Sequence, residues 1–294
     1  ADGALFRWVS SLRCLLTGGG ADMAYYLKRA GKNLWHGKFS IFPEDVAVHA
    51  ISTRLGGVSR PPYDALDLAL HVGDEAAAVR ENRGLFARSL GLDARRIVTP
   101  EQVHGDAVAC VDEQDAGRGS QSYDDSIKET DALITDTPGL PLMLCFADCT
   151  PIVFLDPEKR AVGIAHGGWK GTVQSIAAKT LARMTEAFGT QPRDVLVGIG
   201  PSIGPCCYEV GAEVAARFCA AFPYAEELLL HETDGHVHLD LWEANRQQLL
   251  RSGVPEENIE VAGECTCCRH AWYYSYRADQ GKTGRIAALI SLRS

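Results

Sequence analysis

The stretch LPLMLCFADCTPIVFLDPEKRAVGIAHGGWKG, Leu140–Gly171, contains three nearly continuous apolar runs separated by short polar segments. The runs cover Leu140–Phe146, Ile152–Asp156 and Ala161–Ala165, and a similar run, Asp131–Thr135, precedes them. Such runs, without regular polar alternation, are typical of strands that are buried on both faces. The stretch therefore predicts sheet strands that are covered on both sides.

A helix with clear ends is predicted directly after this stretch. Thr172 is its expected N-cap and Gly189 its stop. Apolar residues at helical spacing form one stripe between them: Val173, Ile176, Ala177, Leu181, Met184 and Phe188. Further helices are predicted at 75–90, 212–222 and 241–251, and further strands at 195–199, 259–262 and 285–292. Because helices and strands interleave while several strand pairs share short turns, we predict an α/β protein of the α+β type.

Length, charge and hydropathy narrow the class of protein. The 294 residues allow one large domain or two small ones, and the net charge of −9 argues against a general nucleic-acid binder. No apolar stretch is long enough to cross a membrane, and the glycines at 18–20 interrupt any signal peptide. We therefore expect a cytoplasmic protein without nucleic-acid or membrane partners, and the oligomeric state stays open. Residues 1–38 lack periodicity and are assigned to an N-terminal extension, with the folded domain at 39–294.

Three short segments place a metal-binding side chain at or near a predicted strand end. They supply His104 in QVHG, Cys149 in ADCTP and His166 in HGGWKG. Two imidazoles and one thiolate form a ligand set that suits zinc or copper, and three protein ligands leave a fourth position open, as in catalytic zinc sites. We predict Zn²⁺ here, with copper as the alternative. Taken singly, however, each histidine is more often an ordinary polar residue, and a lone cysteine is more often a small buried side chain.

Other side chains near these segments are candidates for catalysis. Asp148, beside the thiolate, is a candidate to orient a ligand or to carry a proton. Lys170 lies four residues after His166 and is the best placed cation to reach an anion, and Arg54 and Arg277 complete a basic set. Alternatively, all three side chains lie on the solvated surface without a role in catalysis, which is the usual location of Lys and Arg.

A second group of cysteines lies later in the chain. Five residues form it: Cys206, Cys207, Cys265, Cys267 and Cys268. In principle they suit a closed site of four thiolates, but the spacing C-x-C-C differs from that of common zinc ribbons. We therefore favour buried thiols lining a pocket over a second metal.

With these segments collected, the chain resembles the laccase-domain family, whose members are described as multicopper polyphenol oxidoreductases and as purine nucleoside phosphorylases. The resemblance runs from about Ser52 to Leu292. Its markers are TRLGGVS (53–59), HVGD (71–74), ENR (81–83), QVHG (102–105), TDA (130–132), ADC (147–149), HGGWKG (166–171), GPSIGPCCY (200–208) and SYR (275–277). Three positions depart from the family pattern: Asp67 stands where Asn is common, Gly167 where Ala is frequent, and Ala278 where a second Arg is frequent.

The resemblance implies a fold, a ligand set and an activity. The fold is a single domain of layered mixed β-sheets flanked by helices, and the metal ligands are again His104, Cys149 and His166. The implied activity is phosphorolysis of adenosine, inosine and guanosine, with purine nucleosides and phosphate as substrates. Cleavage of methylthioadenosine and deamination of adenosine are associated activities.

Three other functions compete with this one. Copper-dependent oxidation of phenols would need several copper ions, which usually have many His ligands. A nucleotide-sensing module would hold a structural metal, closed by a fourth protein ligand. A thiol hydrolase would use Cys149 as nucleophile, with His104 or His166 as base.

Overall fold

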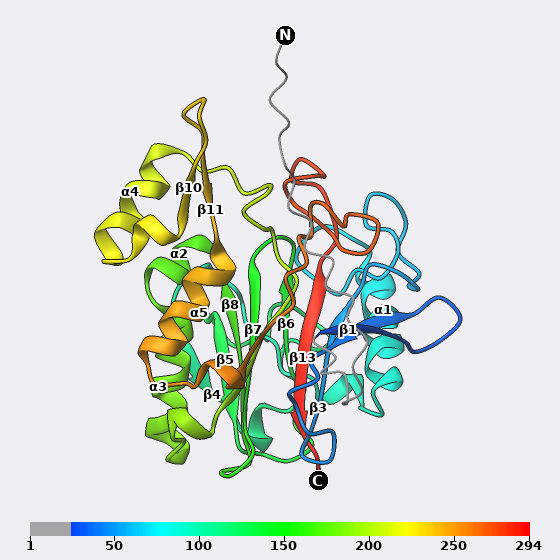
Figure 1. Ribbon diagram of the computed structural model, residues 1–294. Coiled ribbons are helices and arrows are strands. Elements are labelled where there is room, and N and C mark those ends of the chain that lie inside the picture. Colours follow the sequence, from blue (N-terminus) through cyan, green and yellow to red (C-terminus); the bar gives the residue numbers. More distant parts are fainter. Residues whose placement is uncertain (1–24) are drawn as a thin grey trace, which may run out of the picture.

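The computed structural model describes residues 25–294, in which two β-sheets pack face to face between layers of helices (Figure 1). One sheet is antiparallel and has the order β1 (Tyr26–Arg29), β2 (Trp35–Lys38), β3 (Ala47–Ser52), β13 (Ile286–Leu292), β6 (Leu142–Phe146). The other is mixed and has the order β12 (Ile259–Val261), β9 (Leu196–Ile199), β7 (Thr150–Asp156), β8 (Ala161–Gly167), β5 (Ala132–Thr135), β4 (Val108–Cys110).

The helices cover the outer faces of the two sheets. Helix α1 (Ala76–Ser89) packs on the antiparallel sheet, whereas α3 (Ile176–Phe188) and α5 (Leu241–Arg251) pack on the mixed sheet. Beside α5, the short helix α2 (Trp169–Val173) and α4 (Ala212–Ala221) enclose a smaller apolar cluster with the hairpin of β10 (Leu229–His231) and β11 (Val237–Leu239). In the described part of the chain, no helix has the length and apolarity needed to cross a membrane.

Alternate residues of the central strands explain their continuous apolar runs. In β6, Leu142 and Leu144 face the core between the two sheets, whereas Met143 and Cys145 face the α1 layer. The side chains of strand β7 alternate in the same way: one set faces the core between the two sheets, and the other set faces the α3 layer. Since side chains of a strand alternate between its faces, a strand buried on both sides must be apolar at nearly every position. The predicted fold class, with layered mixed sheets flanked by helices, is confirmed.

The predicted single helix from Thr172 to Phe188 is wrong in one respect. The chain forms α2 and then α3, and the break lies at Ser175, whose φ of 63° is left-handed. Thr172 is buried inside α2 and contacts Asn245 of α5 instead of capping a helix. Gly189 ends α3 with a left-handed φ of 72°, as predicted.

The antiparallel sheet begins earlier in the chain than the predicted domain boundary at residue 39. Strands β1 and β2 lie within the segment that was assigned to the N-terminal extension, and β2 pairs with β3. Trp35 of β2 also packs edge-on against Trp272, with ring centroids 5.7 Å apart. Residues 25–38 are therefore part of the folded unit, and residues 1–24 of the extension lie outside the described residues.

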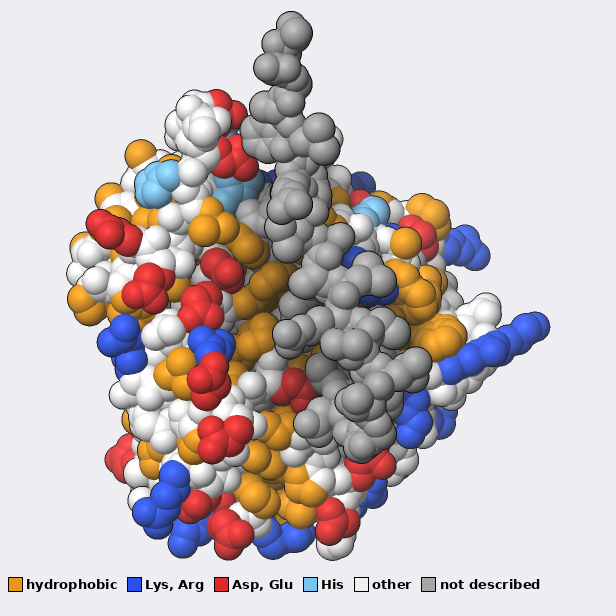
Figure 2. Space-filling view, in the orientation of Figure 1, with side chains coloured by type: hydrophobic (Ala, Val, Ile, Leu, Met, Phe, Trp, Pro, Cys, Tyr) orange, Lys and Arg blue, Asp and Glu red, His pale blue; other side chains and the backbone are white. Residues whose placement is uncertain are grey.

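The charged side chains on the visible surface are mixed. On the face that Figure 2 shows, Lys and Arg side chains are interspersed with Asp and Glu over the helices that cover the mixed sheet. A broad basic surface, which binding to a phosphate backbone requires, is not seen on that face of the described residues.

Candidate metal centre

Three segments meet at one end of the mixed sheet and bring His104, Cys149 and His166 together. His166 is near the end of β8 and pairs in register with Pro151 of β7, so Cys149, just before β7, lies beside it. His104 comes from the loop that leads into β4. One ligand atom from each of the three residues lies within 4.8 Å of the others. The two histidine rings meet edge to face, with centroids 4.8 Å apart.

Two of the segments have left-handed backbone next to the site. His104 has φ of 61° and Asp148 has φ of 83°, although neither is glycine. Such conformations cost about 1–3 kcal/mol each and persist where surrounding contacts hold them. For His104 these contacts come from Asp131, and for Asp148 they come from the segment 265–277.

Asp131 is the residue that organises the centre, and we did not predict it as a site residue. Its Oδ1 atom is 2.9 Å from Nδ1 of His166 and also accepts the backbone N–H of His104. Its Oδ2 accepts the N–H groups of Val103 and Gly105. Although burial opposes ionisation, the hydrogen bond from His166 and these N–H groups lower the pKa of Asp131. The carboxylate thus fixes the His104 loop and leaves Nε2 of His166 free to face the other ligands.

The only sequence signal for Asp131 was its place in the family marker TDA. A second residue that we missed, His71, belongs to the marker HVGD. Although His71 is exposed, partial desolvation by its neighbours and the nearby charge of Arg285 lower its pKa, with smaller contributions from His166 and His104. Its ring contacts that of Tyr123, with centroids 4.9 Å apart.

The three side chains also tune one another's protonation. Burial alone would raise the pKa of the Cys149 thiol, but the charge of His166 and hydrogen bonds from both histidines lower it to about 6. Burial alone would lower the pKa of His166, but Cys149 and Asp131 raise it to about 9. Each partner therefore favours the charged form of the other, thiolate for Cys149 and imidazolium for His166. The thiolate is the form of cysteine that binds metals.

Gly168 leaves the space that a metal ion would need. A Cβ atom at this position would lie 3.1 Å from Sγ of Cys149 and 3.2 Å from Cδ2 of His104. It would also lie 3.8 Å from Cε1 of His166, so it would sit among all three ligands. The donor set and the space that Gly168 leaves both fit a borderline-soft cation such as Zn²⁺.

The four predicted catalytic residues lie in different settings. Asp148 is buried, and its carboxylate accepts hydrogen bonds from Oγ1 of Thr266 at 2.7 Å and from the N–H of Arg277 at 2.7 Å. The guanidinium of Arg277 donates to the carbonyls of Cys207 and Glu209. Both residues therefore hold loops beside Cys149.

Arg54 and Lys170 differ in how much of their hydrogen-bonding capacity is used. The guanidinium of Arg54 contacts the carbonyl of Asp64 and Nε2 of His270, and it lines a cavity of about 570 Å³. Lys170 is exposed on α2, and its ammonium lies 5.7 Å from the centre of the Trp169 ring. No ion pair involves Lys170 among the described side chains.

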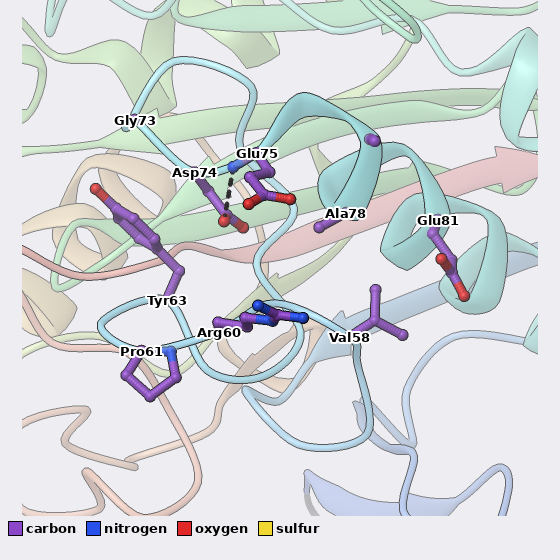
Figure 3. Close-up of a pocket in the computed structure, with 10 residues that line it drawn as sticks. Val58, Arg60, Pro61, Tyr63, Gly73, Asp74, Glu75, Ala78 and Glu81 are labelled. Atoms are coloured by element: carbon purple, nitrogen blue, oxygen red, sulfur yellow. Dashed lines mark hydrogen bonds between the residues drawn. The ribbon is translucent and has the colours of Figure 1, made fainter.

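Another cavity, of about 410 Å³, lies where the loop around Tyr63 meets the start of α1. Figure 3 shows Asp74 and Glu75 facing the loop that carries Arg60 and Tyr63. Three carboxylates line this cavity, from Asp74, Glu75 and Glu81. Because like charges repel, a phosphate ion is disfavoured there relative to the cavity that Arg54 lines.

The sequence is similar to known proteins over most of its length. Residues 48–293 match the family described as multi-copper polyphenol oxidoreductase laccase. The chain belongs to this family. Purine nucleoside phosphorylase YlmD from Geobacillus stearothermophilus is 42% identical over 248 residues, covering 84% of this chain and 90% of that protein. Adenosine deaminase RL5, from an unknown prokaryotic organism, is 35% identical over 240 residues, covering 81% and 91%.

Solved structures of similar proteins have the same fold. The crystal structure of YlmD from Geobacillus stearothermophilus matches with a TM-score of 0.86 and 38% identity, covering 91% of this chain and 99% of that chain. A crystal structure of NMB0706 from Neisseria meningitidis matches with a TM-score of 0.76 and 30% identity, covering 90% and 100%. The resemblance seen in the sequence is thereby confirmed at the level of family and fold.

Proposed function

We propose that this laccase-family chain is a metal-dependent purine nucleoside phosphorylase. Its proposed substrates are adenosine, inosine, guanosine and methylthioadenosine, with phosphate as the second substrate. The observation that carries the proposal is the convergence of His104, Cys149 and His166 around the space beside Gly168. Relatives named purine nucleoside phosphorylase, which are similar over most of the chain, support the reaction class.

His104, Cys149 and His166 would hold the cation, Zn²⁺ in preference to copper. When bound, such a cation with an open position would polarise a group on the purine or activate a water molecule. Asp131 keeps His166 and the His104 loop in place through its two carboxylate oxygens. Because both oxygens of Asp148 also accept hydrogen bonds, we assign Asp148 a positioning role in preference to proton transfer.

In phosphorolysis, an oxygen of phosphate forms a bond to C1′ of the ribose while the bond from C1′ to the purine nitrogen breaks. The purine leaves with the bonding electrons and takes up, directly or through solvent, the proton that the hydrogen phosphate ion releases, and ribose 1-phosphate remains. The transition state carries positive charge on the sugar, which a nearby anion stabilises. We propose Lys170 as the main phosphate contact because its ammonium is exposed and has no ion-pair partner among the described residues. Arg54 and Arg277 would add positive potential.

Chromatography of adenosine and inosine incubated with the zinc-loaded protein, with and without phosphate, tests this function. We expect adenine and hypoxanthine to appear together with ribose 1-phosphate, and only when phosphate is present. Unchanged nucleosides in both tubes would refute the proposal.

Adenosine deamination is a second candidate activity because one relative is named adenosine deaminase. In the same experiment it would yield inosine from adenosine without phosphate. Oxidation of phenols, which the family description suggests, would instead require turnover that rises with copper loading. The described residues contain one cluster of His and Cys side chains and one of four cysteines, and neither has the many His ligands typical of multicopper oxidases.

A further inference from the structure

Four cysteine thiols gather where two turns meet, apart from the His104, Cys149 and His166 centre. Cys206 and Cys207 come from the turn after β9, and Cys265 and Cys268 come from the turn after β12. Their four Sγ atoms all lie within 4.8 Å of one another. Sγ of Cys268 is 3.5 Å from that of Cys206 and 3.4 Å from that of Cys207. All four are free thiols, so disulfides do not account for the cluster.

These distances fit a metal site. Zinc binds thiolates at about 2.3 Å, so the sulfurs of a tetrahedral site are about 3.8 Å apart. A disulfide would instead require a separation of about 2.05 Å. The four sulfurs thus have nearly the spacing of tetrahedral ligands, although no bond joins them.

The backbone around Cys265 is arranged to stabilise a thiolate. Its Sγ accepts the N–H of Gly204 at 3.3 Å and the N–H of Cys268 at 3.5 Å. Hydrogen bonds to the charged form of a group favour that form. Cys265 is buried, whereas Cys206 and Cys268 are exposed at the surface. A ligand that enters from solvent would therefore find one inner thiolate and three outer thiols.

The spacing in the chain agrees with this arrangement. Cys265 and Cys268 have two residues between them, which is a common spacing for paired zinc ligands. The pattern C-x-C-C also counts Cys267, which lies between Cys265 and Cys268 in the sequence but does not belong to the cluster. The pair with zinc-ligand spacing is therefore not obvious from that pattern. The favoured interpretation, buried thiols lining a pocket, does not account for two exposed cysteines in a cluster of four.

We propose that Cys206, Cys207, Cys265 and Cys268 bind a second Zn²⁺ ion in a closed, structural site. With four sulfur ligands, such a site has no open position for substrate. This inference does not depend on the proposed nucleoside chemistry.

A metal there would hold together the wall of the first centre. Thr266, between two of the proposed ligands, donates to the carboxylate of Asp148, the neighbour of Cys149. Arg277 donates to the same carboxylate through its N–H and to the carbonyl of Cys207 through its guanidinium. Joining the two turns would therefore keep Asp148, and with it Cys149, in place.

Zinc content per chain, measured by mass spectrometry on full-length protein after dialysis, tests the proposal. We expect about two zinc ions in the wild type and about one each in Cys149→Ala and in the double variant Cys206→Ser/Cys207→Ser. Cys267→Ser is the matched control, since it removes a neighbouring thiol outside the cluster, and it should keep about two. A double variant with as much zinc as the wild type would overturn the proposal.

Cobalt spectra of Cys149→Ala decide the question even if the double variant fails to fold. After exchange of zinc for Co²⁺, this variant should keep the intense thiolate-to-cobalt absorption of a tetrahedral four-sulfur site. If Cys149→Ala, folded by circular dichroism, shows no such absorption, the proposal is wrong. It is equally wrong if the four thiols are paired as disulfides in the purified protein and bind no cobalt after reduction.

Discussion

At the scale of single residues, Gly168 controls the space between the proposed ligands. We predict that Gly168→Ala weakens zinc binding at this centre and reduces nucleoside cleavage, because the added methyl group would lie 3.1 Å from Sγ of Cys149. Its φ of −71° is accessible to alanine, so backbone strain would not cause the loss. Zinc content and turnover can be measured against Gly211→Ala, where an added Cβ meets nothing within 4 Å. Equal zinc binding in both variants would refute the assigned role of Gly168.

Asp67 is a buried carboxyl group with one oxygen unused. Oδ1 accepts the N–H groups of Arg285 and Ala69, but Oδ2 has no partner. Burial raises the pKa of Asp67 from 3.8 to about 7. Between these values the folded state holds a proton that the unfolded state has lost, so the free energy of unfolding falls as pH rises through this window.

We predict that Asp67→Asn flattens this dependence because the amide does not titrate. Between pH 5 and pH 8, urea unfolding should therefore show a change in stability that is about 1–3 kcal/mol less favourable in the wild type than in the variant. The exposed control Asp124→Asn should behave like the wild type. If the stability of Asp67→Asn changes with pH by the same amount as that of the wild type, the raised pKa of Asp67 does not contribute.

At the scale of elements, Asp131 joins the start of β5, the end of β8 and the His104 loop. Asp131→Asn keeps the size of the side chain but removes its charge. If the amide nitrogen of the new side chain replaces Oδ2, it is a donor that faces two backbone N–H donors and cannot accept from them. We expect zinc affinity to fall by about 10- to 100-fold while the protein stays folded. Competition with a chelator measures this, and the exposed control Asp136→Asn should have wild-type affinity. Unchanged affinity in Asp131→Asn would mean that Asp131 does not orient the ligands.

The elements differ in how far the sequence predicts them. Strands β6, β7 and β8 were predictable because both of their faces are buried, which leaves an apolar run with turn residues between strands. The break between α2 and α3 was not, because Ser175 adopts a left-handed φ that local sequence does not mark. Strand β1 was missed because it is only half-buried and short, and its pairing with β2 decides its structure.

At the scale of the whole molecule, the candidate centre combines segments that are distant in the chain. The proximity of Cys149 and His166 was predictable because Cys149 follows the buried strand β6 and His166 lies near the end of β8. His104 lies in a loop, and its signal was the QVHG segment. The role of Asp131 was not predictable from spacing, since its partners come from a loop and from another strand. The cavity beside Arg54 likewise forms only when residues 33–35, 54–56, 64–65 and 270–271 meet.

The most direct test of the central claim is phosphorolysis of inosine by zinc-loaded wild-type protein and by Cys149→Ala, with the exposed Cys219→Ala as the matched control. We predict equal amounts of hypoxanthine and ribose 1-phosphate from the wild type and Cys219→Ala. Loss of the thiolate ligand should slow Cys149→Ala by about 100-fold or more. Wild-type turnover by a folded Cys149→Ala protein would contradict the claim that this metal centre is the active site.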